Sequence, residues 1–71
     1  MNAPDWLAAF AEKLDTPAPT RDELKAVLDL AAEAAHSSER IAAPVACWLA
    51  ARAGMDLDRA LKLAQEVPSD G

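Results

Sequence analysis

Residues 41–51 read Ile-Ala-Ala-Pro-Val-Ala-Cys-Trp-Leu-Ala-Ala, and no charged side chain interrupts them. Because Pro44 suits the first turn of a helix and Gly54 is a typical C-terminal stop, we expect a helix over residues 42–53. A helix that is apolar on every side must be enclosed by its neighbours. We therefore predict that this helix is the central one of the fold.

Three further segments repeat apolar residues at the i, i+3, i+4, i+7 spacing of a helix with one buried side. We expect them to form helices over residues 4–14, 21–36 and 56–67. Thr20 and Glu23 make a capping box at the start of the second helix, and Asp56 is a suitable N-cap for the fourth.

Each flanking helix is expected to bury one apolar stripe. In the first helix the stripe contains Leu7, Phe10 and Leu14, with Trp6 at its edge. In the second it consists of Leu24, Val27, Leu28, Ala31 and Ala35, and Leu30 lies beside it. The predicted fold is all-α: a compact four-helix domain over residues 1–71, with the third helix central and residues 68–71 as a frayed tail.

The composition limits the class of protein. The chain has 18 alanines and 9 leucines, which favour helices, and a single cysteine, which excludes an internal disulfide and indicates a reducing compartment. It has neither a signal-peptide pattern nor an apolar run of about 20 residues. We therefore expect a cytoplasmic protein that does not enter a membrane.

Nucleic-acid binding is disfavoured on two grounds. Twelve acidic against seven basic side chains give a net charge of −5, which repels phosphate backbones. The second and third helices resemble a helix-turn-helix pair, yet the third carries no polar side chain to read bases before Arg52.

The pattern of reactive residues does not predict an enzyme. Nucleophilic catalysis needs a nucleophile beside an oriented base, and the one histidine, His36, has only its sequence neighbours Ser37 and Ser38 as hydroxyl partners. Cys47 is expected to be a small core residue. A chain with only two glycines has no glycine-rich phosphate loop, so we predict no cofactor.

Glu33 and His36 are the polar pair that most needs weighing. At i, i+3 they share a helix face, as metal ligands do in di-iron bundles, but those sites point inward and need a second such pair. Asp29, one turn earlier, could complete a weak surface site for zinc or nickel. The ordinary interpretation is that a charged His36 suits the negative end of the helix dipole, and a third interpretation is contact with a partner.

Arg40 and Arg52 have two interpretations each. Arg40 lies between two apolar helices, and Arg52 lies in the last turn of the third helix, where its charge suits the helix C-terminus. The alternative is that each guanidinium binds a carboxylate or phosphate of a partner.

The stretch from Leu28 to Val45 resembles a small helical domain family of high-GC Gram-positive bacteria, whose members carry an LDLAR-x-x-AH-x-x-x-R-P-A-A-P-[LV]-like segment. Trp6-Leu7, His36, Arg40 and Ala42-Ala43-Pro44 match the pattern, whereas Ile41 stands where the family usually has proline. The resemblance implies a link to molybdenum-cofactor biosynthesis, because such domains occur alone or fused behind a molybdopterin-guanine-dinucleotide nucleotidyltransferase. That enzyme is not part of this sequence, so the link implied is through association.

We therefore expect a non-catalytic helical module that binds a protein partner, implied by the resemblance to be a molybdopterin nucleotidyltransferase or a molybdoenzyme. The candidate partner-binding residues are Asp29, Glu33, His36, Arg40 and Arg52. The alternative hypothesis is a small-ligand or metal-binding protein that uses Glu33, His36 and Arg40, and a nucleic-acid binder is the third.

Overall fold

The computed structural model describes residues 1–68, and these form four helices and no strand. The helices are α1 (Ala3–Lys13), α2 (Arg21–Ser37), α3 (Ala42–Arg52) and α4 (Leu57–Gln65). Each bound lies within two residues of the one expected, so the all-α, four-helix prediction is confirmed. The end of the predicted frayed tail, residues 69–71, lies outside the described residues. No helix of the described chain has the length and apolar character needed to cross a membrane.

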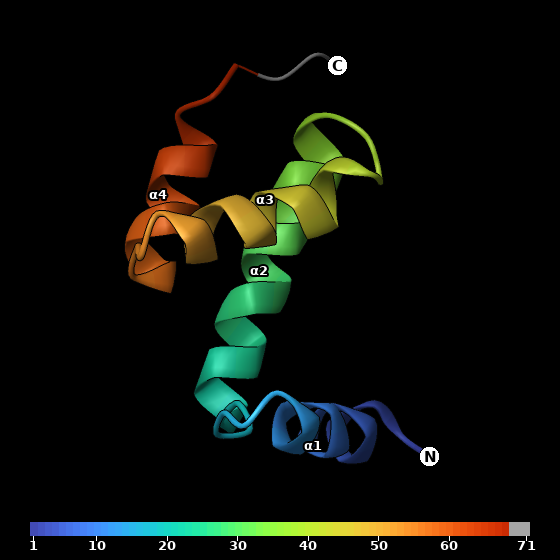
Figure 1. The fold of residues 1–71 in the computed structure, drawn as a ribbon. Coiled ribbons are helices and arrows are strands. Elements are labelled where there is room, and N and C mark those ends of the chain that lie inside the picture. The colour runs from blue at the N-terminus through green and yellow to red at the C-terminus, as the bar shows by residue number, and fades with distance from the viewer. Residues whose placement is uncertain (69–71) are drawn as a thin grey trace.

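The central helix is α2, not α3. In Figure 1, α3 crosses α2, and α4 runs alongside α2. Helix α2 packs against both of them. Among residues 1–68, α3 contains no buried residue, and Trp48 is 57% exposed. The prediction that the third helix is central is therefore wrong.

The small side chains of α3 explain this difference. Its partly buried residues are Ala42, Ala43, Ala46, Cys47 and Ala50. The sulfur of Cys47 lies 3.8 Å from the carbonyl oxygen of Val27, which places this side of α3 against α2. An alanine-rich side lets two helix axes approach closely. The large side chains of α3 then remain on the side that faces away from α2.

The buried side of α2 also differs from the predicted stripe. Leu30 is 2% exposed, whereas Leu28, expected in the core, is 58% exposed. Leu30 lines a groove of about 320 Å³ together with apolar residues of both α3 and α4. Because α2 must contact two neighbours, it buries the side that faces the seam between them.

The predicted helix starts are present. The hydroxyl of Thr20 accepts a hydrogen bond from the backbone N–H of Glu23 at 3.1 Å, and the Glu23 carboxylate accepts one from the backbone N–H of Thr20 at 2.8 Å. Asp56 accepts from the N–H of Arg59 at 3.2 Å. At the start of α1, Asn2 accepts from the N–H of Asp5 at 2.8 Å, a cap that the sequence analysis did not identify.

α1 rests on the linker that follows it and has few contacts with the other three helices. Its buried residue is Ala11, at 6% exposure, and the carbonyl of Ala11 accepts a hydrogen bond from the N–H of Thr16. Pro4 and Leu7 line a groove with Pro19 and Leu24, where the linker enters α2. In Figure 1, α1 accordingly lies across the N-terminal end of α2.

Gly54 is expected to be sensitive to substitution for a backbone reason alone. Its φ is +66°, and a Cβ added there would meet nothing within 4 Å. Gly54→Ala should therefore lower the free energy of unfolding by about 1–2 kcal/mol, the cost of a left-handed conformation for an L-residue. Urea unfolding followed by circular dichroism measures this loss.

The matched variant is Asp15→Gly, because Asp15 ends α1 with a φ of 58°. Glycine there removes a left-handed penalty of about 1–2 kcal/mol and adds about 0.5–1 kcal/mol of backbone entropy cost, so a small gain in stability is expected. Equal losses for the two variants would contradict this account.

Candidate functional site

The predicted partner-binding residues begin on a polar ridge of α2, formed by Lys25, Asp29, Glu33 and His36. Asp29 accepts a hydrogen bond from the ammonium of Lys25 at 2.8 Å. This bond, with the charge of Asp29, raises the pKa of Lys25 above its ordinary value. Glu33 accepts from the hydroxyl of Ser37 at 3.2 Å. Both carboxylates therefore have partners within α2 itself.

His36 and Arg40 flank the turn that joins α2 to α3, and both are exposed. The carbonyl of Arg40 accepts a hydrogen bond from the N–H of Ala43 at 3.1 Å, so the backbone of this turn leads directly into α3. Among the described residues, no group of three His, Cys, Asp or Glu side chains could hold a metal ion. The structure thus leaves the zinc or nickel site considered for Asp29, Glu33 and His36 unassembled.

Arg52 does not approach the ridge. Its guanidinium carbon lies 5.0 Å from the ring centroid of Trp48, one turn earlier on α3. This distance is within the range of a cation–π contact. The contact places the charge of Arg52 beside an exposed aromatic ring.

The α3 outer face is the side of α3 that faces away from α2. It consists of Ile41, Val45, Trp48 and Arg52, which recur at helical spacing. The three apolar members are 72%, 54% and 57% exposed, in chain order. Val45 and Trp48 were expected in the core, so this face was not predicted. The one signal for it in the sequence is that small and large residues occupy opposite sides of α3.

The α1 outer face repeats the same arrangement. It consists of Trp6, Phe10 and Leu14, which are 54%, 46% and 58% exposed. The rings of Trp6 and Phe10 lie 5.2 Å apart between centroids, so they form one aromatic surface. The predicted burial of Phe10 and Leu14 in a core stripe is therefore wrong. α1 buries Ala11, keeps Leu7 partly buried and turns Trp6, Phe10 and Leu14 outward.

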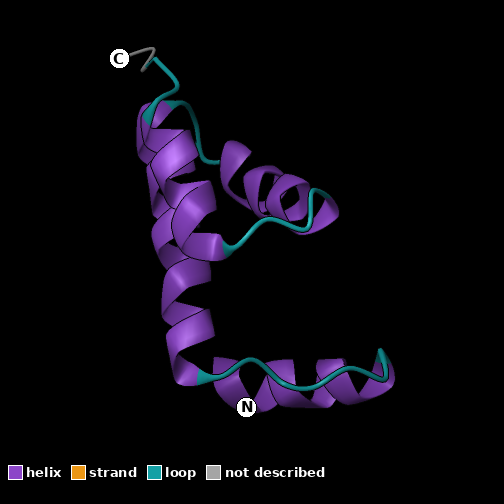
Figure 2. Ribbon diagram, turned by 90° about the vertical axis from the view of Figure 1, so that its left-hand side faces the viewer, coloured by secondary structure: helices purple, strands orange, loops and turns teal. Residues whose placement is uncertain are grey.

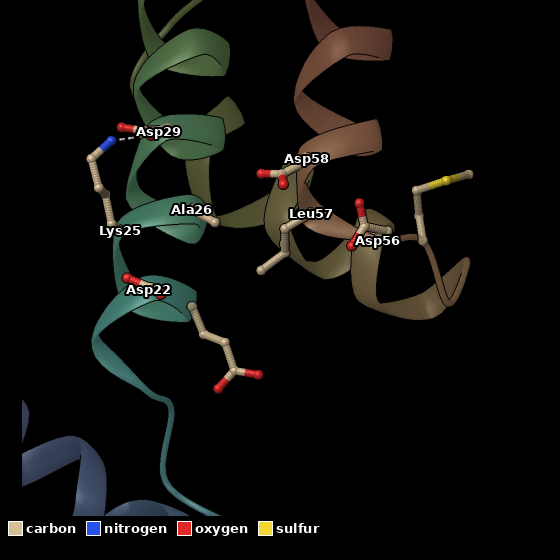
Figure 3. A pocket seen from close by; sticks show the side chains of 9 residues that line it. Asp22, Lys25, Ala26, Asp29, Asp56, Leu57 and Asp58 are labelled. Atoms are coloured by element: carbon tan, nitrogen blue, oxygen red, sulfur yellow. Dashed lines mark hydrogen bonds and ion pairs between the residues drawn. The ribbon is translucent and has the colours of Figure 1, made fainter.

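A broad acidic hollow separates the N-terminal half of α2 from the start of α4 (Figure 3). It has a volume of about 620 Å³, and its lining residues are Asp22, Glu23, Lys25, Ala26, Asp29, Met55, Asp56, Leu57 and Asp58. Three of its carboxylates are already engaged, since Asp29 pairs with Lys25, Asp56 caps α4 and Glu23 belongs to the capping box of α2. Five carboxylates around one lysine disfavour a phosphate-bearing ligand here.

Cys47 lies partly buried between α3 and α2. Burial raises the pKa of its thiol above the ordinary value, because the low-dielectric surroundings disfavour the thiolate. We expect a thiol reagent to modify Cys47 more slowly in the native protein than in urea, and the pH midpoint of the native reaction to lie above that of the unfolded chain. A native rate equal to the unfolded rate would contradict the packing of α3 on α2.

Comparison with known proteins places the chain in a family. A domain of unknown function, DUF6457, matches residues 1–70. The chain belongs to this family. The match covers all four helices of the DUF6457 domain, including α1 with its exposed aromatic face and the turn with His36 and Arg40. No curated protein and no solved structure matches the chain.

Proposed function

We propose that this DUF6457 domain is a non-catalytic interaction module that works by binding a protein partner. The observation that carries the proposal is the exposure of all three aromatic residues: Trp6, Phe10 and Trp48 are between 46% and 57% exposed. Clustered exposed apolar side chains mark contact surfaces, and tryptophan and arginine are enriched where binding energy concentrates. The contact of Arg52 with Trp48 adds such a pair on α3.

The positions of the reactive side chains support a non-catalytic role. The sulfur of Cys47 is beside the carbonyl of Val27, whereas His36 lies nine residues further along α2. Nine residues span about 13 Å along a helix axis, so the imidazole and the thiol do not form a nucleophile–base pair. The raised pKa of Cys47 also disfavours its reactive thiolate form.

The partner that we propose is a molybdopterin nucleotidyltransferase or a molybdoenzyme, which would make the chain an accessory to molybdopterin-guanine-dinucleotide biosynthesis. The proposal is supported by family analogy, through the resemblance that His36, Arg40 and Ala42-Ala43-Pro44 carry. The contact loop would be residues 36–40 with the adjoining polar ridge. Arg40 is exposed and offers a planar fork that can bind a partner's carboxylate through two hydrogen bonds.

A pull-down tests this proposal. The tagged chain, incubated with lysate of its source organism, should retain a molybdopterin nucleotidyltransferase or a molybdoenzyme that mass spectrometry identifies. His36→Ala combined with Arg40→Ala should weaken that retention at least about tenfold, since the loss of one partner of an interfacial charge pair is costly. The circular dichroism spectrum should not change.

The matched control is Arg59→Ala combined with Lys62→Ala, which removes two exposed side chains from α4. This variant should retain the partner as the wild type does. Retention of nothing specific by the wild-type chain, or equal weakening by both double variants, would contradict the proposed contact loop.

A further inference from the structure

The chain exposes more surface than a folded monomer of its mass should. Its accessible area is 5724 Å², and this exceeds by about 1,500 Å² the roughly 4,250 Å² that folded monomers of 7.5 kDa expose on average. Stable homodimers bury about 1,000–2,500 Å² per partner. The excess therefore has the size of one homodimer interface.

Part of the exposed area lies on large apolar side chains of two helices. The α1 outer face and the α3 outer face both expose large residues, while α1 buries Ala11 and α3 rests on alanines. Figure 2 shows α1 and α3 projecting on the same side of α2, separated along its length. A single partner on that side of α2 can reach both helices.

Charge selects how two copies would pair. Residues 1–19 contain Asp5, Glu12 and Asp15 against Lys13, a side-chain charge of −2. Residues 38–55 contain Glu39 against Arg40 and Arg52, a side-chain charge of +1. Contact of α1 with α1, or of α3 with α3, brings like charges together, whereas contact of α1 with α3 brings opposite charges together.

We propose that a second copy of this chain covers both faces, with the α1 outer face of each copy on the α3 outer face of the other. A two-fold axis makes the two α1–α3 contacts equivalent. The inference rests on the proposed function in taking the exposed faces as contact surfaces, and it leaves the contact loop, residues 36–40, for a different protein.

Light scattering coupled to gel filtration gives the first test. Interfaces of this size have dissociation constants of about micromolar or tighter, so a protein concentration of roughly 100 µM should populate the dimer. The wild-type chain should then have a mass of about 15 kDa, twice the 7.5 kDa of one chain. A mass of 7.5 kDa would overturn the inference. A chain whose α1 packs on its own α3 would also give this mass, so that arrangement is excluded by a dimer mass.

Two charge variants test the pairing. Phe10→Lys on α1 and Trp48→Glu on α3 should each reduce the mass to that of one chain, because each replaces a large apolar side chain by a charge that faces a segment of the same sign in both contacts. Mixed in equal amounts, they should recover the mass of a dimer. The mixed pair has one wild-type contact and one contact in which the two introduced charges are opposite.

Other pairings give different results. An α1–α1 dimer survives Trp48→Glu, an α3–α3 dimer survives Phe10→Lys, and neither gains mass on mixing, so each of these outcomes overturns the inference. Gln65→Glu, an exposed site on α4, is the control and should remain dimeric. Trp6→Lys is a second variant on the α1 outer face in case Phe10→Lys loses its helical circular dichroism.

The two proposals fail separately. A monomeric chain that retains a nucleotidyltransferase or molybdoenzyme overturns the dimer and keeps the proposed function. A dimeric chain that retains neither overturns the proposed partner and keeps the dimer.

Discussion

Leu30→Ala is expected to lower the free energy of unfolding by about 2–5 kcal/mol, the range for truncation of a buried leucine. Leu30 is 2% exposed and lies in the seam that α2 shares with α3 and α4. A chain of 71 residues has a total stability of roughly 4–10 kcal/mol. The variant should therefore lose a large part of its stability. Urea unfolding followed by circular dichroism, at one fixed protein concentration, measures the change.

Leu28→Ala is the matched control, because it removes the same atoms from the same helix. Leu28 is 58% exposed, so its truncation should change stability by less than about 1 kcal/mol. If Leu28→Ala lost more stability than Leu30→Ala, the buried side of α2 would be the one predicted from the sequence, and the observed orientation of α2 would be wrong.

Ala60→Asp is expected to lower the free energy of unfolding by about 2–4 kcal/mol, since it places a carboxylate without a partner in a buried position. Ala60 is 8% exposed on α4 and lines the same seam as Leu30. An aspartate there would lie among the apolar side chains that line this groove. The loss should be largest near pH 7.

The pH dependence of Ala60→Asp follows from linkage. Burial raises the pKa of the introduced carboxyl in the folded state above the roughly 3.9 of the unfolded chain. Below the unfolded-state pKa both states bind the proton, and the charge-related loss of stability disappears. The loss grows as the pH rises from the unfolded-state pKa to the folded-state pKa, and it is constant above that. Ala51→Asp, at an exposed alanine in the last turn of α3, should lose only about 0.3–1 kcal/mol at pH 7, because a carboxylate there opposes the helix dipole but stays in water. A large loss that does not vary with pH would contradict burial of the charge.

The helix ends could be predicted because their causes are local. Thr20 and Glu23 are three residues apart and satisfy each other's backbone N–H groups, so the capping box needs no other part of the chain. The same is true of Asp56 at the start of α4 and of Gly54 after α3. Exposure of His36 and Arg40 at the turn between α2 and α3 likewise follows from where those helices end.

The outer faces could not be predicted because periodicity alone does not name a neighbour. Trp6, Phe10 and Trp48 lie on apolar stripes, and a stripe is ordinarily the buried side of a helix. Whether another helix of the same chain covers a stripe depends on the linkers and on competing contacts. In this chain Ala11 and Leu7 of α1, and the alanine side of α3, take the intramolecular contacts.

Four helices, their ends and the caps at Thr20 and Asp56 follow from the sequence, because they depend on interactions over three or four residues. Packing between the helices makes α2 central, buries Leu30 rather than Leu28, and leaves the aromatic residues of α1 and α3 facing outward. Leu28 and Leu30 are equally apolar and point to different sides of one helix. The choice between them depends on where α3 and α4 pack, and α3 packs through its alanines because small side chains allow the closest approach to α2.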